Sequence, residues 1–142
     1  MSPLIENLDG LVAESHRVQV NFFNQYRTTI LEVAETVAAS LKNGHKILFF
    51  GNGGSAADAQ HMAAEFVGRF MPDRPAIPAI SLSSNASVLT ALANDYGYDQ
   101  IFARQLEAYG NPGDTAIAIS TSGNSSNVLA GIKVAQKMGL YT

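Results

Sequence analysis

The sequence contains no cysteine, which excludes disulfides, thiolate zinc sites and a cysteine nucleophile, and which fits a reducing compartment. No apolar run approaches the ~20 residues of a membrane span. The first nine residues carry acids where a signal peptide needs bases followed by an apolar stretch. Charged residues make up only 15% and the net charge is -3, which argues against a nucleic-acid-binding surface. We therefore expect a soluble, cytoplasmic protein with no membrane or nucleic-acid partner.

The apolar content is sufficient for one folded domain. Hydrophobic residues account for 46% of 142 positions, and a chain of this length buries roughly 70% of its unfolded surface. The low charge content leaves apolar surface for subunit contacts. We predict a single domain over residues 1–142, with N-terminal helices over about 1–42 and an α/β core over about 45–142.

The N-terminal segment has helical periodicity. In its first part, the apolar residues that recur at three- and four-residue steps are Leu4, Leu8, Leu11, Val12, Val18, Phe22 and Phe23. A second helix is expected after them, from about Thr29 to Lys42, ended by Asn43 and Gly44.

Beyond residue 45, short apolar runs alternate with helical patterns. Such alternation requires crossover connections, and these predict a parallel sheet with helices on both faces, a three-layer α/β sandwich. The expected strands cover 46–50, 79–82 and 115–119, and the expected helices cover 55–70, 88–93, 100–108 and 127–138. After Gly139 the last three residues resemble the start of another strand, so the pattern predicts that the C-terminal part of the domain is missing.

Three loops rich in small residues and hydroxyls follow the expected strands, at 51–55, 83–87 and 120–126. Ligands of open parallel sheets bind at the carboxyl ends of the strands. Glycine lets backbone N–H groups approach a ligand, and a helix N-terminus adds unpaired donors. Taken singly, Ser55 and Ser125 are better explained as helix caps. Two such loops side by side favour a phosphate.

Three kinds of phosphate site compete. A Walker A loop fails because no lysine occurs between Lys46 and Lys133. Residues 51–56 match the loose Gly-x-Gly-x-x-Ala dinucleotide pattern, but Ser83–Asn85 stands where that pattern needs an acid ending the second strand. A phosphorylated sugar held by serine and threonine loops remains.

The helix after the first loop carries a polar stripe at steps of three and four, formed by Asp58, His61, Glu65 and Arg69. His61 and Glu65 share a face, so they could bind one divalent metal, or Glu65 could act as a base. Spacing alone equally favours an exposed face of paired charges. The position of the stripe, one turn beyond the phosphate loop, favours a site, although two ligands do not complete a zinc centre.

Five polar residues are weaker candidates. Asn94 and Asp95 are best explained as part of a turn, with Asp99 capping the following helix. Arg69 and Arg104 are candidate anion contacts, although an isolated arginine is usually solvated or at an interface.

Together these motifs resemble the phosphoheptose isomerases of the sugar-isomerase (SIS) domain superfamily, from the N-terminal helices to the last residue. The motifs that carry the resemblance are Phe50–Ser55, Asp58, His61, Glu65, Gly68–Arg69, Asn94–Asp95 and Ser120–Ser125. The resemblance implies a homotetramer with sites shared between subunits, one zinc ion per subunit and a cytoplasmic location.

The implied reaction is the aldose–ketose conversion of sedoheptulose 7-phosphate to D-glycero-D-manno-heptose 7-phosphate, in the synthesis of lipopolysaccharide precursors. Glu65 would be the catalytic base, and His61 with Glu65 would bind the zinc. The remaining zinc ligands, a glutamine and a histidine, lie in the family on a C-terminal helix that this sequence lacks. The residues implied to contact substrate are Asn52, Gly53, Gly54, Ser55, Glu65, Arg69, Asn94, Asp95, Ser120, Thr121, Ser122 and Ser125.

Two alternatives stay open. One is a non-catalytic SIS module that senses a phosphosugar or associates with a replication initiator; such relatives can dispense with the carboxylate that Glu65 provides, so its presence with His61 favours the enzyme. The other is a different aldose–ketose isomerase, because the loops recognise phosphate and hydroxyls rather than sugar length.

Overall fold

The computed structural model describes residues 2–71 and 73–142. Its contacts divide the chain into two compact units, one ending at Thr36 and the other beginning at Val37.

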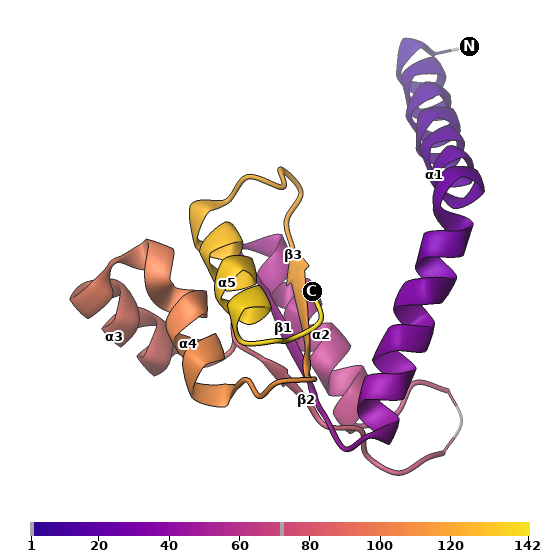
Figure 1. The fold of residues 1–142 in the computed structure, drawn as a ribbon. Helices are drawn as coiled ribbons and strands as arrows, with labels where there is room; N and C mark the ends of the chain where they lie inside the picture. The colour runs from indigo at the N-terminus through magenta and orange to yellow at the C-terminus, as the bar shows by residue number, and fades with distance from the viewer. Residues whose placement is uncertain (1, 72) are drawn as a thin grey trace. The chain divides into compact units, whose positions relative to one another are not determined.

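The N-terminal segment is one helix, α1 (Pro3–Lys42), of 40 residues (Figure 1). The prediction of a separate second helix from Thr29 was therefore wrong. The stretch between Phe23 and Thr29 contains no glycine or proline, so nothing in the sequence ends the first helix there. Gly44, with a φ of 84°, follows the helix, as expected for a glycine stop.

The second unit is built on a parallel sheet of three strands in the order β2-β1-β3 (Figure 1). The strands are β1 (Ile47–Gly51), β2 (Ala79–Ser81) and β3 (Thr115–Ile119). The predicted parallel sheet is confirmed. All five residues of the central strand β1 are buried, which explains why its sequence is a continuous apolar run rather than an alternating one.

The helices that follow the strands are α2 (Gly54–Val67), α3 (Ala86–Tyr96), α4 (Ile101–Tyr109) and α5 (Ser126–Lys137), with a 3₁₀ turn, η1 (Tyr98–Gln100), before α4. In Figure 1, α2 lies on one side of the sheet, and α4 and α5 lie on the other. The three-layer arrangement is therefore as predicted.

The side chains on the two faces of β1 pack into two separate apolar cores. Leu48 and Phe50 pack with α4 and α5, through a cluster that includes Phe102 and Leu106. Ile47 and Phe49 face the other way and pack in a second cluster, formed by Ile47, Phe49, Ala59, Ala63 and Ala79 with Val37, Leu41, Phe66, Ile117 and Ile119 at its edge. The last turns of α1 and the apolar face of α2 thus cover one side of the sheet.

The segment after Gly139 pairs beside β3. Thr115 and Tyr141 form a parallel bridge, in which Ala116 N donates to Tyr141 O at 2.8 Å and Tyr141 N donates to Asp114 O at 2.9 Å. The prediction that a further strand begins here is consistent with this bridge.

A buried carboxylate, Asp114, ties the amino ends of β1 and β3 together. Its side chain is 1% exposed and accepts from Lys46 N at 3.0 Å, from Lys46 Nζ at 2.5 Å and from Asn111 N at 2.8 Å. Burial disfavours the charged form, but the hydrogen bonds from Lys46 and Asn111 and the charge of Lys46 outweigh it and lower the pKa of Asp114. This contact was not predicted.

Candidate active site at the carboxyl ends of the strands

The carboxyl ends of β1 and β2 are joined by a single hydroxyl. Ser83 Oγ accepts from Gly51 N at 3.2 Å and donates to Gly51 O at 2.8 Å. Ser84 Oγ donates to Ser81 O at 2.9 Å, and Asn85 caps α3 by accepting from Val88 N at 3.1 Å. The hydroxyls of Ser83 and Ser84 and the amide oxygen of Asn85 are thus engaged by backbone groups.

The first loop requires glycine for two different reasons. A Cβ on Gly51 would lie 2.7 Å from Ile119 O and 2.8 Å from Ser55 Cβ, so only glycine lets β1 approach β3 and α2 this closely. Gly53 has a φ of 55°, and a Cβ on Gly53 or Gly54 would meet no atom within 4 Å. The backbone of these two glycines therefore faces open space, where a ligand can approach it.

The helix-capping explanation of Ser55 and Ser125 is not borne out. The N-cap of α2 is Gly53 and that of α5 is Ser125, and neither helix has a side-chain capping hydrogen bond. The two hydroxyls are thus not used to cap these helices.

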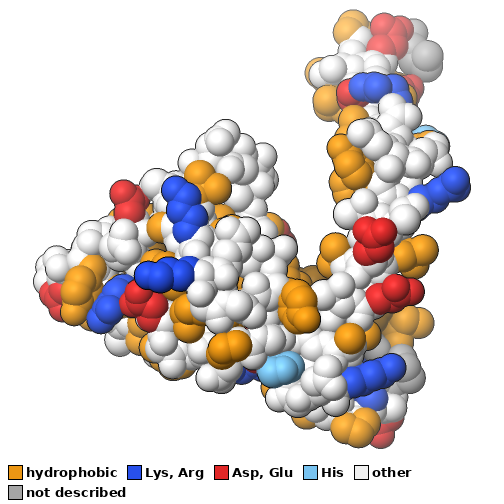
Figure 2. All heavy atoms as spheres, in the orientation of Figure 1, with side chains coloured by type: hydrophobic (Ala, Val, Ile, Leu, Met, Phe, Trp, Pro, Cys, Tyr) orange, Lys and Arg blue, Asp and Glu red, His pale blue; other side chains and the backbone are white. Residues whose placement is uncertain are grey.

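The third loop gathers three hydroxyls at the start of α5. Ser120 Oγ lies 3.4 Å from both Ser122 Oγ and Ser125 Oγ. Gly123 N donates to Ser120 Oγ at 3.1 Å, which fixes the turn. The loop carries no charged side chain (Figure 2), so it offers an anion neutral donors and the dipole of α5 rather than a cation.

A pair of amides connects the first loop to α5. Asn52 Nδ2 donates to Asn127 Oδ1, and Asn127 Nδ2 donates to Asn52 Oδ1, both at 2.8 Å. Asn127 is 2% exposed. Tyr98 Oη also donates to Asn52 Oδ1, at 3.1 Å. Neither Asn127 nor Tyr98 was predicted to belong to the site.

Asp99, the residue after Tyr98, also contacts α5, but it does not cap the following helix as predicted. The residue before α4 is Gln100, and α4 has no side-chain cap. Asp99 Oδ1 instead accepts from Ser126 Oγ at 2.5 Å, in the first turn of α5. The prediction that Asp99 caps the following helix was wrong, because the interposed 3₁₀ turn directs its carboxylate to a helix 27 residues away in sequence.

The polar stripe on α2 has three members rather than four. Helix α2 ends at Val67, so Arg69 is an exposed residue beyond the helix and not part of the stripe. The helix ends at a glycine, because its C-cap is Gly68. Arg74, which the sequence did not single out, donates to Phe66 O at 2.9 Å and to Glu65 O at 2.6 Å, and so satisfies carbonyls of the last turn.

His61 and Glu65 are brought together as their spacing predicts. His61 Nε2 lies 3.9 Å from Glu65 Oε1, with the histidine side chain 75% and the glutamate 32% exposed. Both line a pocket of about 310 Å³ whose walls are Met62, Phe66, Phe70 and Arg74. A carboxylate beside an imidazole against an apolar wall can move a proton or share a cation.

The remaining candidates lie on exposed surface. Asn94 Nδ2 donates to its neighbour, Asp95 Oδ1, at 2.8 Å in the last turn of α3. Arg104 stacks over the Tyr96 ring at 4.7 Å and pairs with Glu107 at 2.9 Å, so its guanidinium is engaged by α3 and α4.

His61 and Glu65 are two side chains of kinds that can bind a metal, but they do not form a complete metal centre. Among the described residues, no group of three histidine, aspartate or glutamate side chains could hold an ion. His61 and Glu65 alone fit a shared ion, because two ligands of tetrahedral zinc lie about 3.4 Å apart, slightly closer than their present separation.

A parallel α/β domain with a glycine loop and a serine loop at its strand ends is typical of the SIS class, and a family model described as "SIS domain" matches residues 12–142. The chain belongs to the phosphoheptose isomerases of the SIS domain family. It is 52% identical to a phosphoheptose isomerase of Aquifex aeolicus over 139 residues, covering 98% of this chain and 73% of the relative. It is 58% identical to that of Thermodesulfovibrio yellowstonii, covering 89% of this chain and 63% of the relative.

Solved structures agree with these comparisons. A phosphoheptose isomerase from Francisella tularensis has a TM-score of 0.91 and 34% identity, with 99% of this chain and 73% of that chain covered. The structure from Neisseria gonorrhoeae has a TM-score of 0.87 and 42% identity, with 96% and 71% covered. The chain is therefore shorter than its relatives, of which several are spanned by only 60 to 64%.

Proposed function

We propose that the intact protein is an aldose–ketose isomerase that converts sedoheptulose 7-phosphate to D-glycero-D-manno-heptose 7-phosphate. The observation that carries this proposal is the convergence of Ser120, Ser122 and Ser125 at the start of α5, in a chain that retains a His–Glu pair on α2. The first feature suits a phosphate and the second suits proton transfer, and both are needed by an isomerase of phosphosugars.

The phosphate is held by neutral donors. The N-termini of α2 and α5 supply backbone N–H groups with a partial positive charge. The hydroxyls of Ser55, Ser120, Thr121, Ser122 and Ser125 add side-chain donors. The sugar lies against the open backbone of Gly53 and Gly54 and near Asn52, Arg69, Asn94 and Asp95.

In the reaction, Glu65 carries a proton between adjacent carbons of the substrate. Removal of a proton beside the carbonyl gives an enediol, and return of the proton to the neighbouring carbon completes the interconversion. Met62 and Phe66 flank the carboxylate and limit its contact with water. His61, whose Nε2 lies 3.9 Å from Glu65 Oε1, shares with it the face of α2 that lines the pocket.

Zinc is the proposed cofactor, with His61 and Glu65 as two of its ligands. When bound, it supplies a Lewis acid that stabilises negative charge on a substrate oxygen. We expect His61→Ala to weaken zinc binding by the intact protein about 100-fold or more, because one of few ligands is lost. Zinc titration against His16→Ala, an exposed histidine of α1, checks this. Equal affinities of the two variants would remove His61 from the metal site.

The phosphate site has a direct structural test. Crystals of the intact protein soaked with sulfate or a sugar phosphate should show the anion at Ser55 and the 120–125 loop. Ser122→Ala should raise the Kd for inorganic phosphate about threefold to tenfold, the effect of one lost hydrogen bond. Ser15→Ala, an exposed serine of α1 outside all three loops, should leave it unchanged. An anion seated elsewhere, with both loops empty, would contradict the phosphate site.

The protein is further proposed to act in the cytoplasm as a homotetramer, in the synthesis of lipopolysaccharide precursors. Support for self-association comes from α1, along which apolar side chains are exposed (Figure 2), including Leu4 at 80%, Leu8 at 59% and Leu11 at 63%. Within the described residues, no helix is both long and apolar enough to cross a membrane.

A further inference from the structure

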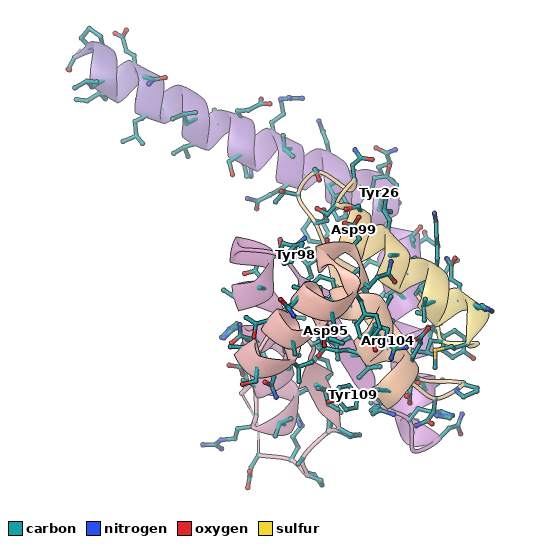
Figure 3. All side chains as sticks on the ribbon, turned by 90° about the vertical axis from the view of Figure 1, so that its left-hand side faces the viewer. Tyr26, Asp95, Tyr98, Asp99, Arg104 and Tyr109 are labelled. Atoms are coloured by element: carbon teal, nitrogen blue, oxygen red, sulfur yellow. The ribbon has the colours of Figure 1, made fainter. Side chains whose placement is uncertain are left out.

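Two neighbouring side chains of the 3₁₀ turn η1 form hydrogen bonds with the two proposed phosphate-binding segments. Tyr98 Oη donates to Asn52 Oδ1 at 3.1 Å, so it reaches the loop after β1. The next residue, Asp99, accepts from Ser126 Oγ at 2.5 Å, so it reaches the helix that begins after the third loop. Figure 3 shows these two labelled side chains at the same end of α4. One short turn is thus bonded to two segments 74 residues apart, at positions 52 and 126.

A second link, between Asn52 and Asn127, joins the same two segments. Asn52 is also bonded reciprocally to Asn127, which is 2% exposed. The oxygen of Asn52 therefore accepts two hydrogen bonds, from Tyr98 and from Asn127, and its amide nitrogen donates one. Most of the hydrogen-bonding capacity of this side chain is spent within the protein rather than left for substrate.

We propose that η1 is a clamp that sets the spacing of the two phosphate loops, with Tyr98 and Asp99 as positioning residues for the substrate phosphate. The inference rests on the proposed phosphosugar function. Donors on separate loops bind one phosphate well only when their spacing is fixed before the ligand arrives, because ordering them on binding costs free energy. Tyr98 acts through Asn52 and Asp99 acts through Ser126, and neither needs to touch the ligand.

The test compares Tyr98→Phe with Tyr109→Phe in the intact protein. Both changes delete one exposed phenol hydroxyl, but Tyr109 lies at the opposite end of α4 (Figure 3). Tyr98→Phe should raise the KM for the sugar phosphate and the Kd for inorganic phosphate about threefold to tenfold, with kcat retained. Asp99→Ala should raise both about tenfold, and Asp99→Asn, which keeps an acceptor for Ser126, should restore most of the loss.

A double-mutant cycle identifies the route of the effect. In an Asn52→Ala background, Tyr98→Phe should have no further effect on KM, because its partner is gone. The clamp is disproved if Tyr98→Phe matches Tyr109→Phe in KM and Kd, or if it lowers only the melting temperature. Failure of the unmutated protein to bind phosphate or turn over the sugar phosphate would instead overturn the proposed function.

Discussion

Replacing Glu65 by glutamine in the intact protein is expected to lower isomerase kcat by about 10²- to 10⁴-fold, the range that general acid–base groups contribute. The amide keeps the shape of the side chain, and therefore the pocket formed with Met62 and Phe66, but it cannot accept the proton. Binding of the phosphosugar should change little, since its phosphate is held by the serine loops and the helix N-termini and not by the last turn of α2, which carries Glu65. The measurement is kcat and KM for sedoheptulose 7-phosphate, with phosphate Kd as the binding control.

The matched control is Glu107→Gln on α4. Glu107 is a more exposed glutamate, at 48%, paired with Arg104 at 2.9 Å. Losing an exposed ion pair costs between zero and about 1 kcal/mol, so this variant should keep normal turnover. If Glu65→Gln retained near-normal turnover, Glu65 would not be the base, and the polar stripe on α2 would be structural.

The layout of the core could be predicted because its signals are local. The strand β1 is a five-residue apolar run that ends in glycine, and β3 has the bounds expected from its composition. The alternation of strands with helices requires crossovers, and crossovers require a parallel sheet. Once the sheet is parallel, its carboxyl ends form one edge, so the glycine and serine loops had to lie together.

Element ends were predicted less well, because they depend on contacts that are distant in sequence. Helix α2 stops at Val67, where Gly68 is the C-cap and Arg74 satisfies the carbonyls of Glu65 and Phe66. Arg69 therefore lies beyond the helical stripe. Helix α1 continues through Thr29 because no residue there breaks it, and periodicity alone does not show where one helix becomes two.

The side-chain network at the site was missed for the same reason. Asn52 and Asn127 are 75 positions apart, and asparagine after a strand or at a helix start is ordinarily explained by turns and caps. Asp99 was assigned to a cap on that basis, and it bonds to Ser126 instead. Only the folded arrangement distinguishes a locally satisfied polar residue from one that joins two loops.

Asp114→Ala is expected to destabilise the fold strongly. It leaves the ammonium of Lys46, which is 20% exposed, without its partner, and it leaves the N–H groups of Lys46 and Asn111 without an acceptor. Breaking a largely buried ion pair by removing one partner costs about 3 kcal/mol or more. Urea unfolding at neutral pH should show a lower midpoint, whereas Glu107→Ala should shift it little, since that ion pair is exposed.

The loss of stability caused by Asp114→Ala should also depend on pH, and it should be smaller in acid. Because the folded pKa of Asp114 is lowered, the unfolded chain binds the proton more readily, and this residue stabilises the fold at pH above its unfolded pKa of about 3.9. That stabilisation disappears as pH falls through the folded pKa. The difference in unfolding free energy between the unmutated protein and Asp114→Ala should therefore be full at neutral pH and shrink below pH of about 4.

Asp114→Asn removes the charge of Asp114 but keeps the shape of its side chain, so it tests the two contributions separately. With its oxygen in the place of Oδ2, the amide can still accept two of the three hydrogen bonds, but its NH₂ group then faces the N–H of Lys46. The variant should therefore be intermediate in stability and should lack the acid-dependent loss. This variant also keeps the test usable if the alanine form fails to fold. An unfolding midpoint that is equal in all three proteins at neutral pH would mean that the amino ends of β1 and β3 are held by the backbone ladder and the apolar core, and that the Asp114–Lys46 contact adds nothing to them.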